Sequence, residues 1–433
     1  MLAARQNLLK LNIESHCYVK LLIFNYLMQT RTYVSECVTN AHPDKMADVI
    51  ADSILDYAVN EDPNTRSGIE VLIKDNTIVL GGELSTKATV PFNEIVRNVV
   101  DNYNFPVSHH LTSEELNIIN LIGVQSSEIN AGVDREDGEI GAGDQGFVVG
   151  YSTSDSKNGL PVATNISRQI CNRLTELHKV NPKIGPDAKS QVVVEYDEDT
   201  DKTTIKSILV STMHSPDLSI EEVRKYVLEN VIKVILVSDW SVLCGGNVNL
   251  PETIIINPCG AWHIGGPVSD CGVTGRKIVV DAYGGYCNVG GGAYSGKDLS
   301  KVDRSAAYLA RFIANVIVNS GIAKDAKVEI SYMISVPNPS SFEISITPNG
   351  NDHIWGVEIF LREWFEKNVS MTPAAIINEF GQNISFADLA KYGHYGDYSP
   401  FGHKVVRPWE SETKILPLSR QLRQDFEQWL SES

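Results

Sequence analysis

The sequence lacks three features that would each assign a class of protein. Its seven cysteines are odd in number and form no C-x-x-C pair, which argues against structural zinc and is typical of a reducing compartment. No apolar run reaches the roughly 18 residues of a membrane-spanning helix. Positive charge is not in excess, because the formal net charge is −17, and this disfavours binding to nucleic acid or to anionic membranes. We therefore expect a cytoplasmic protein that holds small anionic ligands with a local cluster of cations.

The chain does have the length and apolar content for several domains. With 433 residues, 42% of them hydrophobic, it can bury a large core and should form two or three domains. Residues 1–30 are predicted to be a dispensable extension, with Met28 as an alternative start. A targeting leader is the other interpretation, and the few arginines and the presence of Glu14 argue against it.

One layout, helix, β-hairpin and helix, is predicted three times along the chain from apolar periodicity and turn residues. The predicted segments, in chain order, are a helix opening at Pro43, strands at 69–73 and 77–84, a helix at 92–103, a helix at 162–180, strands at 190–197 and 203–213, a helical segment at 220–235, a helix at 303–320, strands at 327–336 and 341–347, and a helix at 355–368.

These repeats predict an α+β fold of three similar helix/β-hairpin/helix domains in a pseudo-threefold arrangement. The predicted ranges are 31–128 for an N-terminal domain, 129–264 for a central domain, 265–410 for a C-terminal domain and 411–433 for a tail. Helices would cover one face of each sheet. The uncovered faces then need a partner, so we expect a homodimer or a larger homo-oligomer.

A glycine-rich loop ending in a lysine is the most informative motif. Gly290-Gly291-Gly292-Ala293-Tyr294-Ser295-Gly296-Lys297-Asp298 would let backbone amides surround a polyphosphate while the ammonium group neutralises it. From Gly291 the loop matches the phosphate-binding pattern G-x-x-x-x-G-K-[ST] except at Asp298. This mismatch argues against a P-loop phosphotransferase, which remains an alternative. A flexible surface turn is the structural alternative.

Four other segments carry chemistry, and each has a structural interpretation when taken alone. They could be a helix cap, a tight turn, a surface ion pair and a solvated basic doublet. The segments are His42-Pro43-Asp44-Lys45, Gly141-Ala142-Gly143-Asp144-Gln145-Gly146, Gly185-Pro186-Asp187-Ala188-Lys189-Ser190, and the run 265–277 that ends in Arg276-Lys277. The doublet Arg276-Lys277 could bind two groups of one polyphosphate, and a strand is predicted after it at 278–281.

Together these motifs resemble the S-adenosylmethionine synthetase (methionine adenosyltransferase) family, from about Tyr33 to Glu410. The resemblance also includes Gly81-Gly82-Glu83, Lys301-Val302-Asp303-Arg304-Ser305-Ala306-Ala307-Tyr308 and Pro408-Trp409-Glu410. It implies a transferase that makes S-adenosylmethionine from ATP, L-methionine and water. Methionine sulfur would attack C5′ and displace triphosphate, which is then hydrolysed to phosphate and pyrophosphate.

The resemblance also implies roles for individual residues, at an active site between two subunits. It implies catalytic roles for His42, Lys189, Arg276, Lys277 and Lys297. It implies ATP contacts for these five and for Asp187, Ala261, Trp262, Asp270 and Ala293. Methionine contacts are implied for Glu83, Gln125, Asp270 and Lys301. Two Mg²⁺ ions would be held with Asp44 and Asp303, and K⁺ with Glu70.

Three departures from the family pattern bear on activity. Asn40 and Ala41 replace the usual Glu-Gly before His42, and Ala261 replaces an arginine near the nucleotide. The gating loop reads Gln125-Ser126-Ser127-Glu128-Ile129-Asn130-Ala131-Gly132-Val133 and lacks the usual proline, which should loosen it. These changes leave a further alternative, a degenerate paralogue that binds nucleotide or a partner subunit without turnover.

Overall fold

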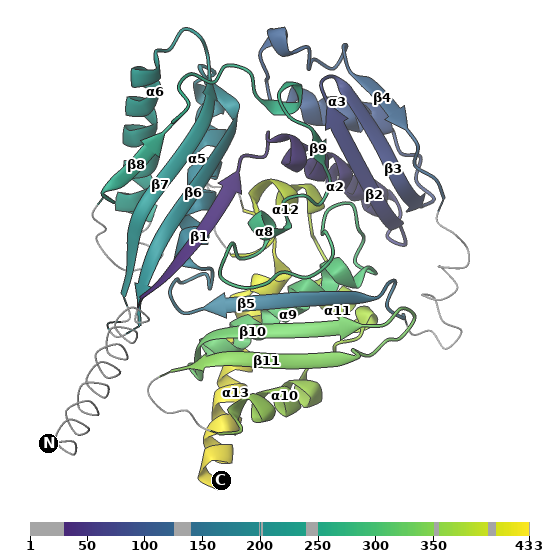
Figure 1. Ribbon diagram of the computed structural model, residues 1–433. Helices are drawn as coiled ribbons and strands as arrows, with labels where there is room; N and C mark the ends of the chain where they lie inside the picture. The colour runs from purple at the N-terminus through teal and green to yellow at the C-terminus, as the bar shows by residue number, and fades with distance from the viewer. Residues whose placement is uncertain are drawn as a thin grey trace, which may run out of the picture.

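The computed structural model describes residues 30–124, 140–198, 200, 202–239, 250–349, 355–396 and 404–432 (Figure 1). The predicted extension, apart from Thr30, and the gating loop with Gln125 lie outside these residues. Within them, none of the helices combines the length and apolar character that crossing a bilayer requires.

Three β-sheets form the framework of the described chain, and Figure 1 shows them arranged around a central group of helices. The four-stranded sheet in the order β1-β6-β7-β8 contains β1 (Thr30–Val38), β6 (Ile184–Asp197), β7 (Lys202–His214) and β8 (Thr253–Ile256). The three-stranded sheet contains β11 (Ser341–Pro348), β10 (Ala323–Tyr332) and β5 (Gly146–Thr153). The other four-stranded sheet contains β4 (Asn117–Asn120), β3 (Thr77–Ser85), β2 (Arg66–Lys74) and β9 (Gly272–Val273).

The predicted order of helix, hairpin and helix is confirmed three times. The flanking helices are α2 (Pro43–Glu61) and α3 (Phe92–Asp101), α5 (Val162–Val180) and α6 (Ile220–Val227), and α9 (Val302–Asn319) and α10 (Val357–Asn368). After α6 the backbone continues in π-helical geometry over Leu228–Ile232 and Ile235–Asp239. The first helix of each copy packs on its own hairpin, so the α+β fold with three similar units is as predicted.

Each hairpin gains a further antiparallel strand from a different part of the chain. Strand β1 pairs with β6, β5 pairs with β10, and β9 pairs with β2. With the predicted ranges, the N-terminal segment therefore gives a strand to the central sheet, the central segment gives one to the C-terminal sheet, and the C-terminal segment gives one back. The exchange is cyclic. The domain ranges themselves stay a prediction.

Buried apolar side chains form a core under each sheet. On α2 the positions Met46, Ile50 and Ile54 follow helical spacing and are fully buried, which is why this sequence forms a helix that packs on β2. Helix α9 is buried over most of its length and lies against β5 and β10. The predicted tail contains α13 (Glu412–Glu432), and its Leu422 is buried in the same core as α9.

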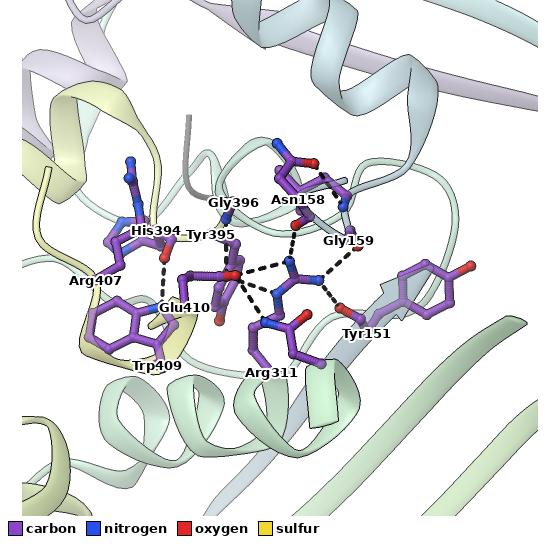
Figure 2. A network of polar contacts seen from close by, with 12 residues as sticks. Tyr151, Asn158, Gly159, Arg311, His394, Tyr395, Gly396, Arg407, Trp409 and Glu410 are labelled. Carbon is purple, nitrogen blue, oxygen red and sulfur yellow. Dashed lines mark hydrogen bonds and ion pairs between the residues drawn. The ribbon is translucent and has the colours of Figure 1, made fainter. Parts of the chain in front are cut away.

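A buried ion pair ties the C-terminal segment to α9 (Figure 2). Arg311 Nε lies 2.9 Å from Glu410 Oε1, and the guanidinium also donates to the carbonyl oxygens of Tyr151, Asn158 and Gly159. The amide of Gly396 donates to the same carboxylate. Three segments that are distant in sequence are therefore joined at one point.

Strand β2 exposes side chains on its outer face in alternation with buried ones. On β2, Ile69, Val71 and Ile73 point into the core while Glu70 and Leu72 are exposed, as the hairpin pattern predicted. Leu72 is 42% exposed. Such an apolar residue on an uncovered sheet face is consistent with a protein partner there.

The strand predicted at 278–281 is wrong, because these residues form one helical turn, α8 (Ile278–Asp281). The amide of Asp281 donates to Lys277 O and that of Ala282 donates to Ile278 O. The Asp281 side chain is buried against Lys45, with Nζ 2.7 Å from Oδ1. Tertiary contacts thus override the strand preference of three β-branched residues.

Two short helices and three 3₁₀ turns are further helical regions of the described residues. Helices α11 (Pro373–Phe380) and α12 (Phe386–Tyr392) lie between α10 and the C-terminal segment. Short 3₁₀ turns occur at Val107–His109, Gly266–Val268 and Pro408–Glu410. Helix α12 packs against α2 near the centre of the molecule (Figure 1).

Candidate active site

The site begins at the N-terminus of α2, where His42 caps the helix. Its Nδ1 accepts the amide of Asp44 at 3.2 Å, and Pro43 occupies the first helical turn, where a missing N–H costs nothing. The strand pairing places Val38, the last residue of β1, opposite Lys189 of β6. This register brings His42 close to the motif that contains Asp187 and Lys189.

Burial and neighbouring cations keep His42 uncharged. Burial, followed by the positive charges of Lys277 and Lys189, lowers the pKa of His42 to about 3. Since Nδ1 accepts a backbone N–H, the proton of the neutral ring is assigned to Nε2. His42 is therefore a neutral hydrogen-bond donor at physiological pH.

The basic doublet meets the first aspartate of α2. Lys277 Nζ lies 2.5 Å from Asp44 Oδ2, and Arg276 Nη1 lies 3.7 Å from Asp44 Oδ1. The amide of Val273 donates to Asp44 Oδ1 at 3.0 Å. Burial alone would raise the pKa of Asp44, but the hydrogen bonds from Lys277 and Val273 lower it overall, so the carboxylate stays ionised.

Asp187 and Asp270 complete this first group. Asp187 is buried and its Oδ2 accepts the amide of Gly266 at 2.7 Å. Burial raises the pKa of Asp187 to about 6, and Lys189 and Lys277 partly oppose this effect. Asp270 is exposed and acts electrostatically on both His42 and Asp187. The structure thus brings together six residues singled out in the sequence besides Asp44, namely His42, Asp187, Lys189, Asp270, Arg276 and Lys277.

A second group forms around the glycine-rich loop. Lys297 Nζ lies 2.7 Å from Asp303 Oδ2 at the start of α9. A Cβ at Gly292 would lie only 2.1 Å from the carboxyl carbon of Asp303, so the glycine is required for the loop to close over this carboxylate. Glu70 lies near Lys297. Although the Glu70 side chain is exposed, surrounding protein atoms partly desolvate its carboxyl group and raise its pKa, and the charge of Lys297 opposes this.

The two cationic loops touch each other. A Cβ at Gly275 would lie 2.5 Å from Cβ of Ala293, so the backbone before Arg276 packs directly on the glycine-rich loop. Gly275 also has a positive φ of 77°. This contact places the group around His42 and the group around Lys297 in one region of the molecule.

In the described ranges, the remaining predicted residues form no hydrogen bond or ion pair with His42 or Lys297. Trp262 donates from its backbone to His214 Nε2 and from Nε1 to Ile264 O, and Ala261 precedes it. Glu83 lies on β3 opposite Gly68 and bridges to Gly123. Lys301 Nζ lies 3.1 Å from Asp298 Oδ2, and Gln125 is outside the described residues.

Two buried aspartates that contact the cationic loops escaped the sequence reasoning. Asp48 and Asp52 continue from Asp44 at intervals of four residues along α2, and they accept the amides of Gly275 and Gly296. This spacing places them on one helix face and was the available signal. The sequence did not show which segments that face would meet.

The carboxylates Asp44 and Asp303 suit a Mg²⁺ ion that is held partly by substrate, rather than a metal ion held only by protein side chains. No cluster of three or more His, Cys, Asp or Glu side chains in the described parts of the chain could hold a metal ion. Mg²⁺, however, is usually held by one or two carboxylates together with substrate phosphates and water. Asp44 and Asp303 are hard oxygen donors, each beside a lysine that would also face a phosphate. Their chemistry therefore fits metal bound together with its nucleotide.

Comparisons with known proteins agree along nearly the whole described chain. Three family models of S-adenosylmethionine synthetase domains match this chain in succession. The N-terminal domain matches residues 30–127, the central domain residues 139–262 and the C-terminal domain residues 264–411. S-adenosylmethionine synthase of Wolinella succinogenes is 40% identical over 372 residues, which cover 85% of this chain and 93% of that protein. The Helicobacter pylori (strain J99) protein of the same name is 39% identical over 368 residues, 84% of this chain and 92% of its own.

A solved structure shares the fold. The structure described as an unusual S-adenosylmethionine synthetase from Campylobacter jejuni aligns with a TM-score of 0.77 at 31% identity. The alignment covers 90% of this chain and 99% of that one.

Proposed function

Since the chain belongs to the S-adenosylmethionine synthetase family and is a methionine adenosyltransferase, we propose that its transfer step displaces the whole triphosphate of ATP. Methionine sulfur forms a bond to C5′, the C5′–O bond breaks, and its electron pair leaves on the triphosphate, which water then cleaves to pyrophosphate and phosphate. The sulfur is already a nucleophile, so the protein's main task is to orient the reactants and stabilise the leaving group.

The observation that carries this proposal is that three cationic side chains and the neutral imidazole of His42 lie close to two glycine-rich loops. Arg276, Lys277 and Lys297 lie on two loops that touch at Gly275 and Ala293. Their charges would balance the negative charge that grows on the leaving triphosphate. We assign the remaining ATP contacts to Asp187, Lys189, Ala261, Trp262 and Asp270, and the methionine contacts to Glu83, Gln125, Asp270 and Lys301.

His42 would act as a hydrogen-bond donor to the departing oxygen. Because its pKa is lowered to about 3, the ring cannot carry a proton as a cation at neutral pH. The Nε2–H remains free to donate while Nδ1 is held by the Asp44 amide. Its contribution is orientation and partial charge stabilisation rather than full proton transfer.

Asp44 and Asp303 would hold magnesium with the nucleotide, and Glu70 would hold potassium. When bound, magnesium supplies positive charge to the phosphate oxygens. Asp44 and Asp303 are each within hydrogen-bond distance of a lysine, so metal and lysine would share the charge of one phosphate chain. Lys297 lies close enough to Glu70 to affect its pKa, so an ion at Glu70 would also influence that lysine.

The active assembly would be at least a homodimer in the cytoplasm. Glu70 and Leu72 share the outer face of β2, so a partner that covers Leu72 would also enclose Glu70. Arg276 is 56% exposed in the single chain, although it belongs to the proposed triphosphate site. Both features are expected if a second protomer completes each active site.

One assay tests the proposed function. The purified chain with methionine and MgATP should form S-adenosylmethionine with equal amounts of pyrophosphate and phosphate, and omission of potassium should slow the reaction. S-adenosylmethionine without cleavage of triphosphate would contradict the second step. Transfer of the γ-phosphoryl group to an acceptor would instead identify a phosphotransferase.

A degenerate paralogue is the second candidate, and Asn40, Ala41 and Ala261 favour it. ATP binding by calorimetry with no turnover would support it. The preserved contacts of His42, Lys277 and Lys297 argue for turnover, because a protein that only binds nucleotide does not require this set of charges.

A further inference from the structure

Four aspartates form a row on one face of α2, and each accepts backbone amides from a segment far away in sequence. The first accepts from Val273, as described above. Asp48 Oδ1 accepts the amide of Gly275 at 2.9 Å, and Asp52 Oδ1 accepts that of Gly296 at 2.8 Å. Asp56 accepts those of Phe386 and Ala387 at 2.7 and 2.9 Å. We call Asp44, Asp48, Asp52 and Asp56 the aspartate row.

The two middle members bind the glycine that directly precedes a cationic residue. Gly275 precedes Arg276, and Gly296 precedes Lys297. Both glycines have positive φ, 77° and 81°, so the chain turns sharply at each. Glycine-rich turns have many accessible conformations, and an acceptor on a rigid helix selects one of them.

Each middle aspartate is also paired with a buried cation. Asp48 Oδ2 lies 3.1 Å from Lys45 Nζ, and the pair is almost fully buried. Asp52 forms a two-point pair with Arg304, at 2.7 and 3.0 Å, and neither side chain is exposed. Arg304 Nη1 also donates to the carbonyl oxygen of Lys297 at 3.1 Å. Asp52 and Arg304 therefore hold the backbone N–H of Gly296 and the backbone carbonyl of Lys297, one on each side of the peptide bond that joins these residues.

We propose that Asp48 and Asp52 are positioning residues that fix the two cationic loops to the helix bearing His42 and Asp44. Four helical residues rise about 6 Å, so adjacent members of the row set the spacing of the loops along α2. Two loops bearing like charges repel one another, and this anchor holds them together before an anionic substrate arrives. The inference rests on the proposed function, because it assigns these aspartates to the triphosphate site.

If the aspartate row served only the stability of the fold, substitution of any member should lower turnover to a similar extent. A positioning role predicts a loss at Asp48 and Asp52 but not at Asp56. Asp56 is on the same helix, but it binds the first amides of α12 and the hydroxyl of Ser385 rather than a cationic loop. Asp56→Asn is therefore the matched control for Asp48→Asn and Asp52→Asn. The same chemical change is made on the same helix face, with a different segment released.

The first measurement is steady-state synthesis of S-adenosylmethionine by the full-length variants. Asp48→Asn and Asp52→Asn should lower kcat by about 10- to 100-fold, since small misplacements of a charged group have effects of this size. KM for methionine should stay within about threefold. Asp56→Asn should keep kcat within about threefold of wild type. An equal loss in all three variants would overturn the proposal.

The second measurement asks whether each aspartate acts through its loop. Asp52→Asn is combined with Lys297→Ala, and Asp48→Asn with Arg276→Ala. If the aspartate acts only by placing the cation, the double variant should be no more than about threefold slower than the cation variant alone. Losses that multiply would show that the aspartate acts elsewhere and would overturn the inference.

Folding and the proposed function are tested separately. In Asp48→Asn, Lys45 keeps Asp281 as a partner at 2.7 Å, so this variant should fold even if Asp52→Asn does not. Binding of inorganic tripolyphosphate with Mg²⁺ is measured beside activity and should weaken about tenfold in Asp48→Asn and not in Asp56→Asn. If wild type binds tripolyphosphate without making S-adenosylmethionine, the proposed function fails and the positioning role stands. If Asp48→Asn binds it as wild type does, the positioning role fails.

Discussion

At the scale of single residues, two lysines of the proposed site form ion pairs with the carboxylates that are proposed to hold magnesium. Lys277 is paired with Asp44, and Lys297 is paired with Asp303. A phosphate that arrives with magnesium can take the lysine while the metal takes the carboxylate, so few new charges have to be desolvated. The arrangement is thus prepared for a metal-bound polyphosphate.

Lys297 offers the most direct test of charge stabilisation. Lys297→Ala should lower the rate of S-adenosylmethionine formation by at least about 10²- to 10³-fold, as found when a preorganised donor is removed from a leaving-group or oxyanion site. The control is Lys206→Ala, because Lys206 is 51% exposed and pairs with Glu195 on the surface. A rate for Lys297→Ala equal to that of this control would remove Lys297 from the site.

His42 should make stability fall in acid. Its pKa is about 3 when folded and 6.5 when unfolded, so the unfolded chain binds a proton first as the pH falls. The contribution of the neutral ring to the free energy of unfolding is fully present above pH 6.5. It decreases between pH 6.5 and pH 3 by up to about 1.4 kcal/mol per pH unit.

Urea unfolding of wild type and His42→Asn between pH 4 and pH 7 measures this loss. The free energy of unfolding should fall less steeply in the variant. Parallel pH curves would contradict a neutral, buried His42.

Sequence reasoning at this scale found the motif residues but not their anchors. His42, Asp44, Lys277 and Lys297 stand in short motifs whose chemistry can be read from neighbouring residues. Asp48 and Asp52 are visible only as a spacing of four on a helix, and the glycine amides they bind are 227 and 244 residues away. Contacts of that range depend on the packing of whole units, which local patterns do not contain.

At the scale of elements, glycine turns allow the loops to approach the helices closely. The carboxylate of Asp303 occupies the space where a side chain at residue 292 would be. At adjacent Gly291, no atom of the described residues other than its chain neighbours lies within 4 Å of the position of a Cβ. The two glycines of one loop therefore differ sharply in what they tolerate.

This difference gives a matched pair of variants. Gly292→Ala should push Asp303 away from Lys297 and lower turnover by about 10- to 100-fold. Gly291→Ala should leave turnover within about threefold of wild type. Equal rates measured in the same S-adenosylmethionine assay would show that closure of the loop over Asp303 is unimportant.

Hairpins were more predictable than short connections. Strands with alternating apolar residues, such as β2 and β3, carry their own register and turn, so their order could be derived from sequence. Residues 278–281 are equally rich in β-branched residues, yet they form a helical turn because Lys45 holds Asp281 in the interior. A four-residue segment has too few local contacts to resist such a tertiary interaction.

At the scale of the whole molecule, buried ion pairs and the hydrogen bonds of their charged groups join segments that are distant in sequence. The pair of Arg311 and Glu410 links α9, the loop after β5 and the C-terminal segment (Figure 2). Removal of one partner leaves the other charge buried, which is the costly case for an ion pair.

Arg311→Met should therefore lower the free energy of unfolding by about 3–5 kcal/mol. The control is Arg423→Met on α13, where Arg423 and Glu427 are 45% and 58% exposed, and the expected change is within about 0.5 kcal/mol. Urea unfolding curves compare the two. Similar midpoints for both variants would contradict a dominant role for the buried pair.

The exposed sheet face predicts self-association. Leu72→Asp would place a charge on the outer face of β2 and should weaken the proposed dimer at least about tenfold, since a buried unpaired charge opposes assembly. The control is Val180→Asp at the end of α5, where Val180 is 77% exposed, and it should have no effect. Light scattering over a dilution series measures both, and an unchanged dimer in Leu72→Asp would place the interface elsewhere.

The cyclic exchange of strands makes the three units interdependent. A fragment ending near residue 128 would retain β1 but lose β6, its hydrogen-bonding neighbour, and β2 would lose β9. Each isolated unit would expose one strand without its pairing partner and one unpaired sheet edge. Both would promote aggregation. The polypeptide should consequently denature in a single concerted transition, and a nascent chain cannot complete its first sheet until the ribosome has delivered residues beyond 270.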